Sequence, residues 1–373
     1  MTAPTTSSTF AIVTGGGTAG HVLPALAIAD ALMAAGHPRE AIHYAGAERG
    51  IEAQLVPPTG YPMTLMPLRG FQRRLSLDNL RAVADLLRSL VQALRLLGRL
   101  RPSVVIAVGG YASGAVGLAA VVRRVPIVVA EQNLVPGAAN RLLGRFARAS
   151  AVSFPGTDLP RAVVTGNPIR GEVASLDPDR DRAEAKRAFG VDPDRRLVLV
   201  FGGSLGSLRI NEATQAAGTL WKDRGDLALH QVVGRRDWEL VSRMPLGGGA
   251  LTHQRVAYED DMPAALAAAD VAVCRSGSST CFELAAAALP AVLVPSPHVT
   301  ADQQTGNARY LVDAGAAVLV PDAELDGARL VAEVDGILAD GDRWAEMAAA
   351  ARRCARPDAA AAIATLATEQ ARG

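Results

Sequence analysis

The feature that most constrains this chain is an alternation of short apolar runs with helix-length amphipathic segments. Continuous apolar runs are typical of parallel strands buried on both faces, with the intervening segments serving as crossover helices. The expected strands are residues 10–14, 42–45, 104–108, 127–130, 149–154, 197–201, 227–233, 271–274, 291–294 and 316–320. We therefore predict an α/β fold of two doubly wound, Rossmann-like domains facing a cleft.

The length of 373 residues is enough for two domains. We place the boundary at Gly166-Asn167-Pro168, so that residues 1–166 and 167–344 are the two domains. The charged, Pro- and Asp-containing stretch 177–194 is expected to be a solvated linker. A last helix from about Trp344 to Thr368 could pack on either domain.

Composition excludes several classes of protein. Apolar residues make up 49% of the chain and charged residues 20%, which is typical of a globular protein with a large core. The three cysteines include no Cys-x-x-Cys pair, so a disulfide scaffold and a cysteine zinc site are excluded and a reducing cytoplasm is favoured. Residues 103–122 are uncharged, but glycines interrupt them, so we expect a strand, a turn and a helix rather than a membrane span.

The net charge of +1 hides an asymmetry between the two halves. Residues 1–165 carry 16 arginines, no lysine and eight acidic residues, whereas the remainder is acidic. A basic half suits nucleic acid or an anionic membrane surface. Few aromatic residues lie between the arginines, which disfavours nucleic acid.

Three glycine-rich turns follow expected strands, at residues 15–20, 109–114 and 202–207. Such turns allow close approach of a phosphate to the amino terminus of a helix. Gly15, Gly17 and Gly20 have dinucleotide-binding spacing, and Glu48 lies near the position of a ribose ligand, which leaves a nicotinamide or flavin enzyme open. Three turns together suit two substrates that each carry a diphosphate, although each turn alone is equally explained by tight strand–helix packing.

The second half contains two further polar clusters. Residues 274–283 place small hydroxyl residues at a helix start, and Glu283, one turn later, could accept two hydrogen bonds from a ribose diol. Gln303 and Gln304, with Asn307, suit sugar hydroxyls. Helix capping and the helix dipole explain both clusters equally well in isolation. The Asp-x-Asp pairs of residues 177–194 do not follow a strand, so we expect no metal site and no cofactor.

These motifs, in this order, resemble a bacterial cell-wall family. The matching stretches are 16–21, 109–114, 131–133, 136–137, 140–141, 166–170, 202–204, 260–262, 275–283, 303–304 and 307–308. The family, glycosyltransferase family 28, adds N-acetylglucosamine to undecaprenyl-diphosphate-linked muramoyl pentapeptide, converting lipid I to lipid II. Ala130 departs from the family, which usually has His before Glu-Gln-Asn, and residues 206–208 also differ.

The resemblance implies the glycosyltransferase-B fold, with the nucleotide sugar held mainly by the carboxyl-terminal domain. It also implies that the last helix, about 345–373, crosses back to the first domain. The residues implied to bind the donor are Arg170 and Ser204 (diphosphate), the backbone at Glu259 (uracil), Glu283 (ribose), Ser278, Ser279, Thr280, Cys281 and Phe282 (diphosphate and sugar), and Gln303, Gln304 and Asn307 (sugar hydroxyls). Those implied to approach the donor sugar and the acceptor from the first domain are Thr18, Ala19, Gly20 and Asn133.

The implied reaction is an inverting displacement at the anomeric carbon that needs a general base. His21 is the first candidate, because it follows the glycine turn and a histidine has a pKa near neutrality. Glu131 is the second candidate. Two alternatives stay open: His21 only hydrogen-bonds the substrate or caps its helix, or the chain is a related glycosyltransferase with another acceptor.

The lipid acceptor implies a peripheral enzyme at the cytoplasmic face of the cell membrane. Arg74, Arg81, Arg88 and Arg95 recur every seven residues within 73–101, which predicts a basic stripe on a helix with leucines on its other sides. An ordinary solvated helix is the alternative. The expected partners are UDP-N-acetylglucosamine, lipid I, an anionic membrane surface and other cell-wall synthesis proteins, without nucleic acid.

Overall fold

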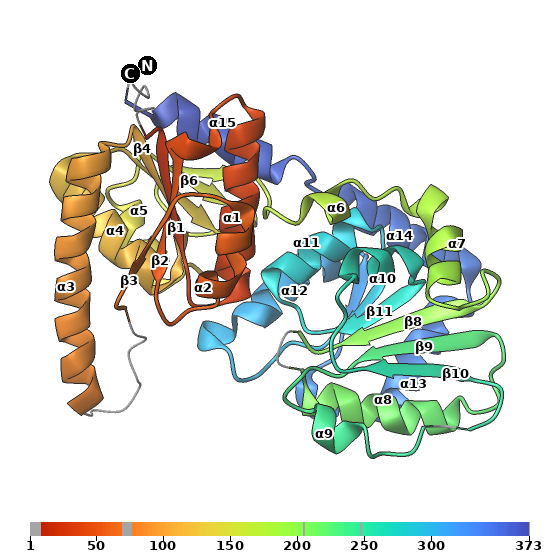
Figure 1. Cartoon of the computed structure of the whole chain (residues 1–373). Coiled ribbons are helices and arrows are strands. Elements are labelled where there is room, and N and C mark those ends of the chain that lie inside the picture. The colour runs from red at the N-terminus through yellow and green to blue at the C-terminus, as the bar shows by residue number, and fades with distance from the viewer. Residues whose placement is uncertain (1–8, 69–76, 204–205, 247, 373) are drawn as a thin grey trace, which may run out of the picture. The chain divides into compact units, whose positions relative to one another are not determined.

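The computed structural model describes residues 9–68, 77–203, 206–246 and 248–372, with backbone alone for residues 77–83 and 300. They form two compact units (Figure 1). The first unit is Met1–Arg170 together with Asp358–Gly373, and the second is Gly171–Pro357. The chain therefore leaves the first unit after Arg170 and returns to it after Pro357.

The first unit is built on a seven-stranded parallel sheet with the order β3-β2-β1-β4-β5-β6-β7. Its strands are β1 (Ala11–Gly15), β2 (Ile42–Ala47), β3 (Met63–Met66), β4 (Val104–Gly109), β5 (Ile127–Glu131), β6 (Ala149–Val152) and β7 (Ala162–Val164). The strand order reverses between β1 and β4. In open α/β sheets, ligands bind beyond the carboxyl ends of the strands at this position.

Helices cover both faces of this sheet. The helices of this unit are α1 (Ala19–Ala34), α2 (Glu52–Leu55), α3 (Leu77–Leu100), α4 (Gly110–Arg123), α5 (Ala138–Gly144) and α15 (Ala359–Gln370), with short 3-10 turns η1 (Arg39–Ala41) and η2 (Pro57–Thr59). Helices α3, α4 and α5 share one core with Ile12, whereas α1 and α15 share the other with Ala11 and Val13. Successive residues of β1 thus face opposite layers, as the strand geometry requires.

The second unit repeats this plan with a six-stranded parallel sheet of order β10-β9-β8-β11-β12-β13. Its strands are β8 (Arg196–Phe201), β9 (Leu227–Val232), β10 (Thr252–Val256), β11 (Val271–Cys274), β12 (Ala291–Leu293) and β13 (Ala317–Leu319). The order reverses between β8 and β11. The predicted fold class is confirmed: both units are Rossmann-like.

The helices of the second unit lie on both faces of its sheet. They are α6 (Gly171–Ala174), α7 (Pro178–Ala188), α8 (Leu208–Leu220), α9 (Trp238–Val241), α10 (Met262–Ala268), α11 (Ser278–Ala286), α12 (Gln303–Val312), α13 (Gly327–Leu338) and α14 (Gly341–Cys354), with 3-10 turns η3 (Thr300–Asp302) and η4 (Asp322–Glu324). One core cluster joins α8, α13 and α14 to the sheet, and a smaller one includes the end of α7.

The stretch 177–194 is not a linker, as the sequence suggested, because most of it forms α7 inside the second unit. The position of α7 is explained by Asp270, a buried residue just before β11. Its carboxylate pairs with Lys186 of α7 at 2.8 Å, with Arg182 of α7 at 3.6 Å and with Arg196 of β8 at 3.2 Å. The charged residues of this stretch therefore attach a helix to the sheet.

Two helix predictions also need correction. The preference of proline for the first turn of a helix predicts a helix that starts at Pro24, whereas α1 begins at Ala19 and contains Pro24. The single last helix expected near Trp344–Thr368 is two helices, α14 and α15, separated around Pro357. A proline cannot continue a helix without losing a hydrogen bond, and here the break coincides with the passage between units. Helix α15 packs against α1 in the first unit.

Helix α3 contains Arg81, Arg88 and Arg95 of the predicted stripe, but its exposed face is less uniformly basic than expected. Arg88, Arg95 and Arg99 are exposed, and Leu87 and Val91 are exposed beside them. Leu87 was expected on another side of the helix. Arg73 and Arg74 lie outside the described residues, as does the side chain of Arg81. In the described part of the chain, no helix is both long and apolar enough to cross a membrane.

Candidate active site

In the first unit, the candidate site is the turn that joins β1 to α1. Gly17 has a left-handed φ of +90°, which favours glycine, and Thr18 precedes the helix. Thr18, Ala19 and Gly20 are at least partly exposed at the start of α1. The Oγ1 atom of Thr18 lies 3.3 Å from Nδ1 of His21. The turn thus presents backbone amides and one imidazole at the carboxyl end of β1.

The second turn of this unit explains where the His21 ring lies. Gly109, at the end of β4, has φ +126°, and a Cβ added there would lie 2.9 Å from Nε2 of His21. Gly109 also accepts a hydrogen bond from Gly16 N–H at 3.3 Å. The buried hydroxyl of Ser113 donates to the carbonyl of Thr14 at 2.6 Å, which joins both turns. Glycine at position 109 therefore makes room for the imidazole.

The environment of His21 favours its neutral form. Burial lowers the pKa of His21 below its ordinary value. The carboxylates of Glu131 and Glu52 and a hydrogen bond to the Gly16 backbone oppose this shift only in part. A neutral imidazole can accept a proton, which is the property that a general base needs.

Glu131, at the end of β5, is buried and its two oxygens are both in use. Oε1 accepts from the amide N–H of Asn133 at 2.9 Å and from its Nδ2 at 3.3 Å. Oε2 accepts from the Gly137 amide at 3.0 Å and from Nδ2 of Asn140 at 2.9 Å. Glu131 therefore holds the loop between β5 and α5, and this geometry favours His21 over Glu131 as a proton acceptor.

One residue of this site was missed by sequence reasoning. Glu52, the first residue of α2, is fully buried and accepts the amide N–H of Gly17 at 3.0 Å. Glu48, which was weighed as a ribose ligand, is exposed four residues earlier. The glycines at positions 46 and 50 on either side of Glu48 were the available signal, since both make room for Glu52.

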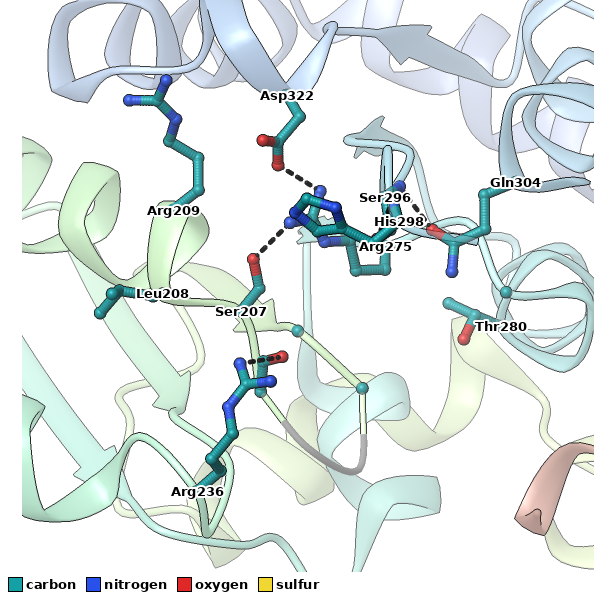
Figure 2. Close-up of a pocket in the computed structure, with 14 residues that line it drawn as sticks. Ser207, Leu208, Arg209, Arg236, Arg275, Thr280, Ser296, His298, Gln304 and Asp322 are labelled. Carbon is teal, nitrogen blue, oxygen red and sulfur yellow. Dashed lines mark hydrogen bonds and ion pairs between the residues drawn. The ribbon is translucent and has the colours of Figure 1, made fainter. Parts of the chain in front are cut away.

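In the second unit, a cavity of about 550 Å³ lies beside the turn after β8 (Figure 2). This volume falls in the range of small-molecule sites. The side chains that line it come from residues that follow β8, β9, β11, β12 and β13. They are Ser207, Leu208, Arg209, Arg236, Arg275, Thr280, Ser296, His298, Gln304 and Asp322, together with the glycines at 202, 203, 206 and 277.

Arg275, directly after β11, is the centre of this pocket (Figure 2). Its guanidinium donates to the Ser207 hydroxyl at 2.7 Å and to the backbone carbonyls of Val294 and Pro295 at 3.0 and 3.1 Å. It also pairs with Asp322 at 2.6 Å. The fork geometry of arginine thus joins the ends of β8, β11 and β12, and Asp322 balances its charge.

Two predicted donor-binding residues line this pocket, Thr280 and Gln304. Gln304 accepts the Ser296 amide N–H at 2.8 Å through Oε1 and its backbone carbonyl accepts the Ser276 hydroxyl at 2.8 Å. Ser279 and Glu283, one turn apart on α11, and Gln303 are partly exposed outside the pocket lining.

The other predicted residues of this unit are less accessible. Cys281 and Phe282 are buried in the core, where the Phe282 ring stacks on Tyr310, so their side chains cannot line a ligand. Asn307 is fully buried and donates to the carbonyl of Ser276 at 3.5 Å, and Ser278 is also buried.

Three further predicted positions need separate mention. Glu259 directs its carboxylate inward, pairing with Nε2 of His230 at 2.8 Å and accepting the Asp261 amide at 3.0 Å. The Glu259 side chain therefore shapes the loop whose backbone was expected to bind uracil. Arg170 is the last residue of the first unit rather than part of the second. Ser204 lies outside the described residues.

The pocket also contains residues to which the sequence analysis gave no role, and these residues share one feature. Ser207, Arg275, Ser296 and Asp322 all follow the carboxyl end of a strand, where α/β folds bind ligands. Among the described residues, no three His, Cys, Asp or Glu side chains come together in a group that could hold a metal ion.

Comparison with known proteins places these features in context. The model of the glycosyltransferase family 28 N-terminal domain matches residues 11–152, and that of the C-terminal domain matches residues 197–363. The chain is 43% identical to the UDP-N-acetylglucosamine–N-acetylmuramyl-(pentapeptide) pyrophosphoryl-undecaprenol N-acetylglucosamine transferase of Salinibacter ruber, over 95% of this chain and 94% of that protein. The protein of the same name from Frankia casuarinae is 42% identical, over 94% and 93%. The crystal structure of MurG from Acinetobacter baumannii superposes with a TM-score of 0.77 at 28% identity, over 96% of this chain and 99% of that chain.

Proposed function

Since the chain belongs to glycosyltransferase family 28, we propose that its second unit binds the nucleotide-sugar donor and that its first unit takes the proton from the acceptor hydroxyl. The chain is a hexosyltransferase of peptidoglycan synthesis. It transfers N-acetylglucosamine from UDP-N-acetylglucosamine to the undecaprenyl-diphosphate-linked N-acetylmuramyl pentapeptide, lipid I, which gives lipid II.

The observation that carries the donor assignment is the pocket around Arg275. A glycine turn and a partly buried guanidinium at the carboxyl ends of parallel strands suit a diphosphate, whose charge increases as UDP leaves. Gln304 and Thr280 line the same pocket and suit the sugar. We assign the ribose to Glu283 and the uracil to the backbone at Glu259, with Arg170 and Ser204 assisting at the diphosphate.

The acceptor chemistry is assigned to His21. The oxygen of the muramoyl 4-hydroxyl forms the new bond to the anomeric carbon, the bond from that carbon to the UDP oxygen breaks with its electron pair, and the anomeric configuration inverts. The hydroxyl proton passes to the neutral imidazole of His21. Glu131 and Asn133 shape the neighbouring loop, and Thr18, Ala19 and Gly20 contact the substrates.

We also propose that the protein associates peripherally with the cytoplasmic face of the cell membrane. The layer formed by α3, α4 and α5 would contact the anionic membrane surface. The exposed charged side chains that the structure describes on these helices are all arginines. Large apolar side chains are exposed on these helices, at Leu87, Val91, Val122 and Leu142, and at Phe146 just after α5. Basic and apolar groups together suit anionic headgroups and the acyl boundary. We also propose other cell-wall synthesis proteins as partners at this membrane surface.

The test is transfer of radiolabelled N-acetylglucosamine from UDP-N-acetylglucosamine to a short-chain lipid I analogue, with product identified as the lipid II analogue. The proposal predicts transfer by the wild type and its loss in Glu283→Ala, with donor affinity reduced in the same variant. Transfer by Glu283→Ala at the wild-type rate and donor affinity would contradict the donor assignment.

A further inference from the structure

We propose that Glu52 is the positioning residue of the glycine turn at residues 15–20, and that its carboxylate keeps His21 in place for proton transfer. This inference rests on the proposed function of His21. It concerns a buried charge that the reaction itself does not consume.

The contacts of Glu52 connect the turn to the neighbouring strand. Its Oε2 accepts the Gly17 amide N–H at 3.0 Å, and its Oε1 accepts the Ala47 amide N–H at 2.8 Å. Ala47 is the last residue of β2, whereas Gly17 follows β1. An ionised carboxylate is costly to bury unless its oxygens are hydrogen-bonded, and here each oxygen has a backbone donor.

Three glycines surround this carboxylate. A Cβ added at Gly16 or Gly50 would overlap the Glu52 carboxylate, and one at Gly46 would lie 2.8 Å from Glu52 Cγ. The backbone can therefore enclose the carboxylate only where side chains are missing. This steric requirement links the glycines of the first turn to those around the end of β2.

A second side chain holds the same turn. The buried hydroxyl of Tyr44 donates to the carbonyl of Gly15 at 2.6 Å. Burial raises the pKa of Tyr44, and the Glu52 charge adds to this effect, so the phenol remains a donor. Glu52 thus accepts from the turn and Tyr44 donates to it, which fixes the backbone on both sides of Gly16.

This arrangement changes the role of the turn. Because the Gly17 amide already donates to Glu52, it is not available to an anionic substrate in this conformation. A buried carboxylate in the turn also disfavours a phosphate there. The turn therefore serves to place the start of α1, where His21 lies, rather than to bind a phosphate through Gly17.

The charges facing His21 make the inference measurable through pH. The ring is faced by Glu131 from β5, by Glu52 from α2 and by the Gly16 backbone, with Thr18 Oγ1 at 3.3 Å. Glu52 and Glu131 both raise the pKa of His21 against the larger effect of burial. Removal of one negative charge therefore lowers the pKa of His21 further. The imidazole then stays neutral at lower pH, and the acid limb of the kcat profile moves to lower pH.

The experiment compares Glu52→Gln with the wild type in the transfer assay. Glutamine keeps the shape but offers one acceptor and one donor, so one backbone N–H faces an NH2 group. We expect kcat to fall about 10- to 100-fold, because small displacements of a reacting group have effects of this size. The donor KM should stay within about twofold, and the acid limb should move to lower pH. Gln54→Ala, exposed on the same helix, is the matched control and should behave as wild type.

Two further variants keep the inference testable if Glu52→Gln does not fold. Tyr44→Phe removes one hydrogen bond from the same turn and should lower kcat several-fold at unchanged donor KM. Gly50→Ala should lower kcat much more in the wild-type background than in the Glu52→Ala background. The added Cβ clashes with the Glu52 carboxylate, which the second background lacks.

Wild-type kcat and pH profile in Glu52→Gln would overturn the inference, as would equal effects of Gly50→Ala in both backgrounds or unchanged kcat in Tyr44→Phe. The failure of the proposed function is separate, because it would appear as absence of transfer by the wild type. A loss of donor affinity in Glu52→Gln with unchanged kcat would likewise contradict a role limited to His21.

Discussion

The two units have the same strand order, but opposite charges stabilise the turns at their strand ends. In the first unit, buried carboxylates hold the turns: Glu52 accepts from Gly17, and Glu131 accepts from Asn133, Gly137 and Asn140. In the second unit, the guanidinium of Arg275 joins three strand ends through donated hydrogen bonds. One backbone plan thus has buried carboxylates at the strand ends of one unit and a guanidinium at the strand ends of the other.

The net charge of each half has the opposite sign from the groups that hold its turns. Residues 1–165 have 16 arginines against eight acidic residues, yet Glu52 and Glu131 are buried beside His21. The later part of the chain is acidic, yet Arg209, Arg236 and Arg275 line its pocket. The bulk charge describes the outer surface, such as the arginines of α3, and not the chemistry of the site.

Removal of the imidazole is the largest expected effect. His21→Ala should lower kcat about 100- to 10,000-fold, since a positioned general base contributes about this much. The donor KM should change little, because the donor is assigned mainly to residues of the other unit. Steady-state kinetics at saturating lipid I analogue measures both. A kcat within about tenfold of wild type would contradict the base assignment.

Removal of the pocket guanidinium should affect binding instead of chemistry. Arg275→Ala leaves Asp322 without its ion-pair partner and takes donors from the diphosphate, so donor KM should rise about 10- to 100-fold. Arg275→Lys should rescue this only in part, because lysine lacks the fork. Arg309→Ala, exposed on α12, is the control. An unchanged donor KM with a reduced kcat in Arg275→Ala would contradict the assignment of donor binding to this pocket.

Acid should weaken both units in the same way. Burial and then the charge of Arg255 lower the pKa of His253 to about 4. This pKa lies below the value of about 6.5 for histidine in the unfolded chain, so the unfolded chain binds the proton more tightly. The contribution of neutral His253 to the free energy of unfolding is therefore complete above about pH 6.5 and is lost as the pH falls towards about 4. The cost from His253 is about 2 kcal/mol at pH 5.

Denaturant unfolding at pH 7 and pH 5 measures this loss, and His253→Gln should reduce it. His43 of the first unit, whose pKa burial also lowers to about 4, should add a contribution of the same sign. An unfolding free energy independent of pH over this range would contradict both assignments.

The smallest effect concerns the outer arginines of the first unit. Arg95→Gln should weaken binding to vesicles of mixed zwitterionic and anionic phospholipid about fivefold, or about 1 kcal/mol. Arg309→Gln of the second unit should have no effect. Sedimentation with vesicles measures both, and high salt should remove the difference. Equal weakening by the two variants would show that the contact is not specific to the α3–α5 layer.

Sequence reasoning found all the central strands and one edge strand, β13, but missed the other three edge strands. Central strands are buried on both faces, so their sequences are continuous apolar runs, such as Val104–Gly109. The three strands that were missed, β3, β7 and β10, are all at sheet edges, where one side is open and apolar runs are not required. For example, β10 has the sequence Thr-His-Gln-Arg-Val.

The site was predicted where a motif is local, and missed where it depends on pairing across the fold. The glycine turns are visible from their spacing, and Gln304, singled out for its side-chain chemistry, lines the pocket. The contact of Glu52 with Gly17 and that of Arg275 with Asp322 join residues 35 and 47 positions apart, which no local spacing encodes. The burial of Cys281 and Phe282 follows from which face of α11 meets the core, and this is known only once the helix is packed.

The most direct test of the division between the units is titration calorimetry of UDP against His21→Ala and Glu283→Ala, combined with the transfer assay on the same preparations. The account predicts that His21→Ala binds UDP with wild-type affinity and transfers almost no sugar, whereas Glu283→Ala binds UDP at least about tenfold more weakly. Weak UDP binding by His21→Ala together with wild-type binding by Glu283→Ala would contradict it.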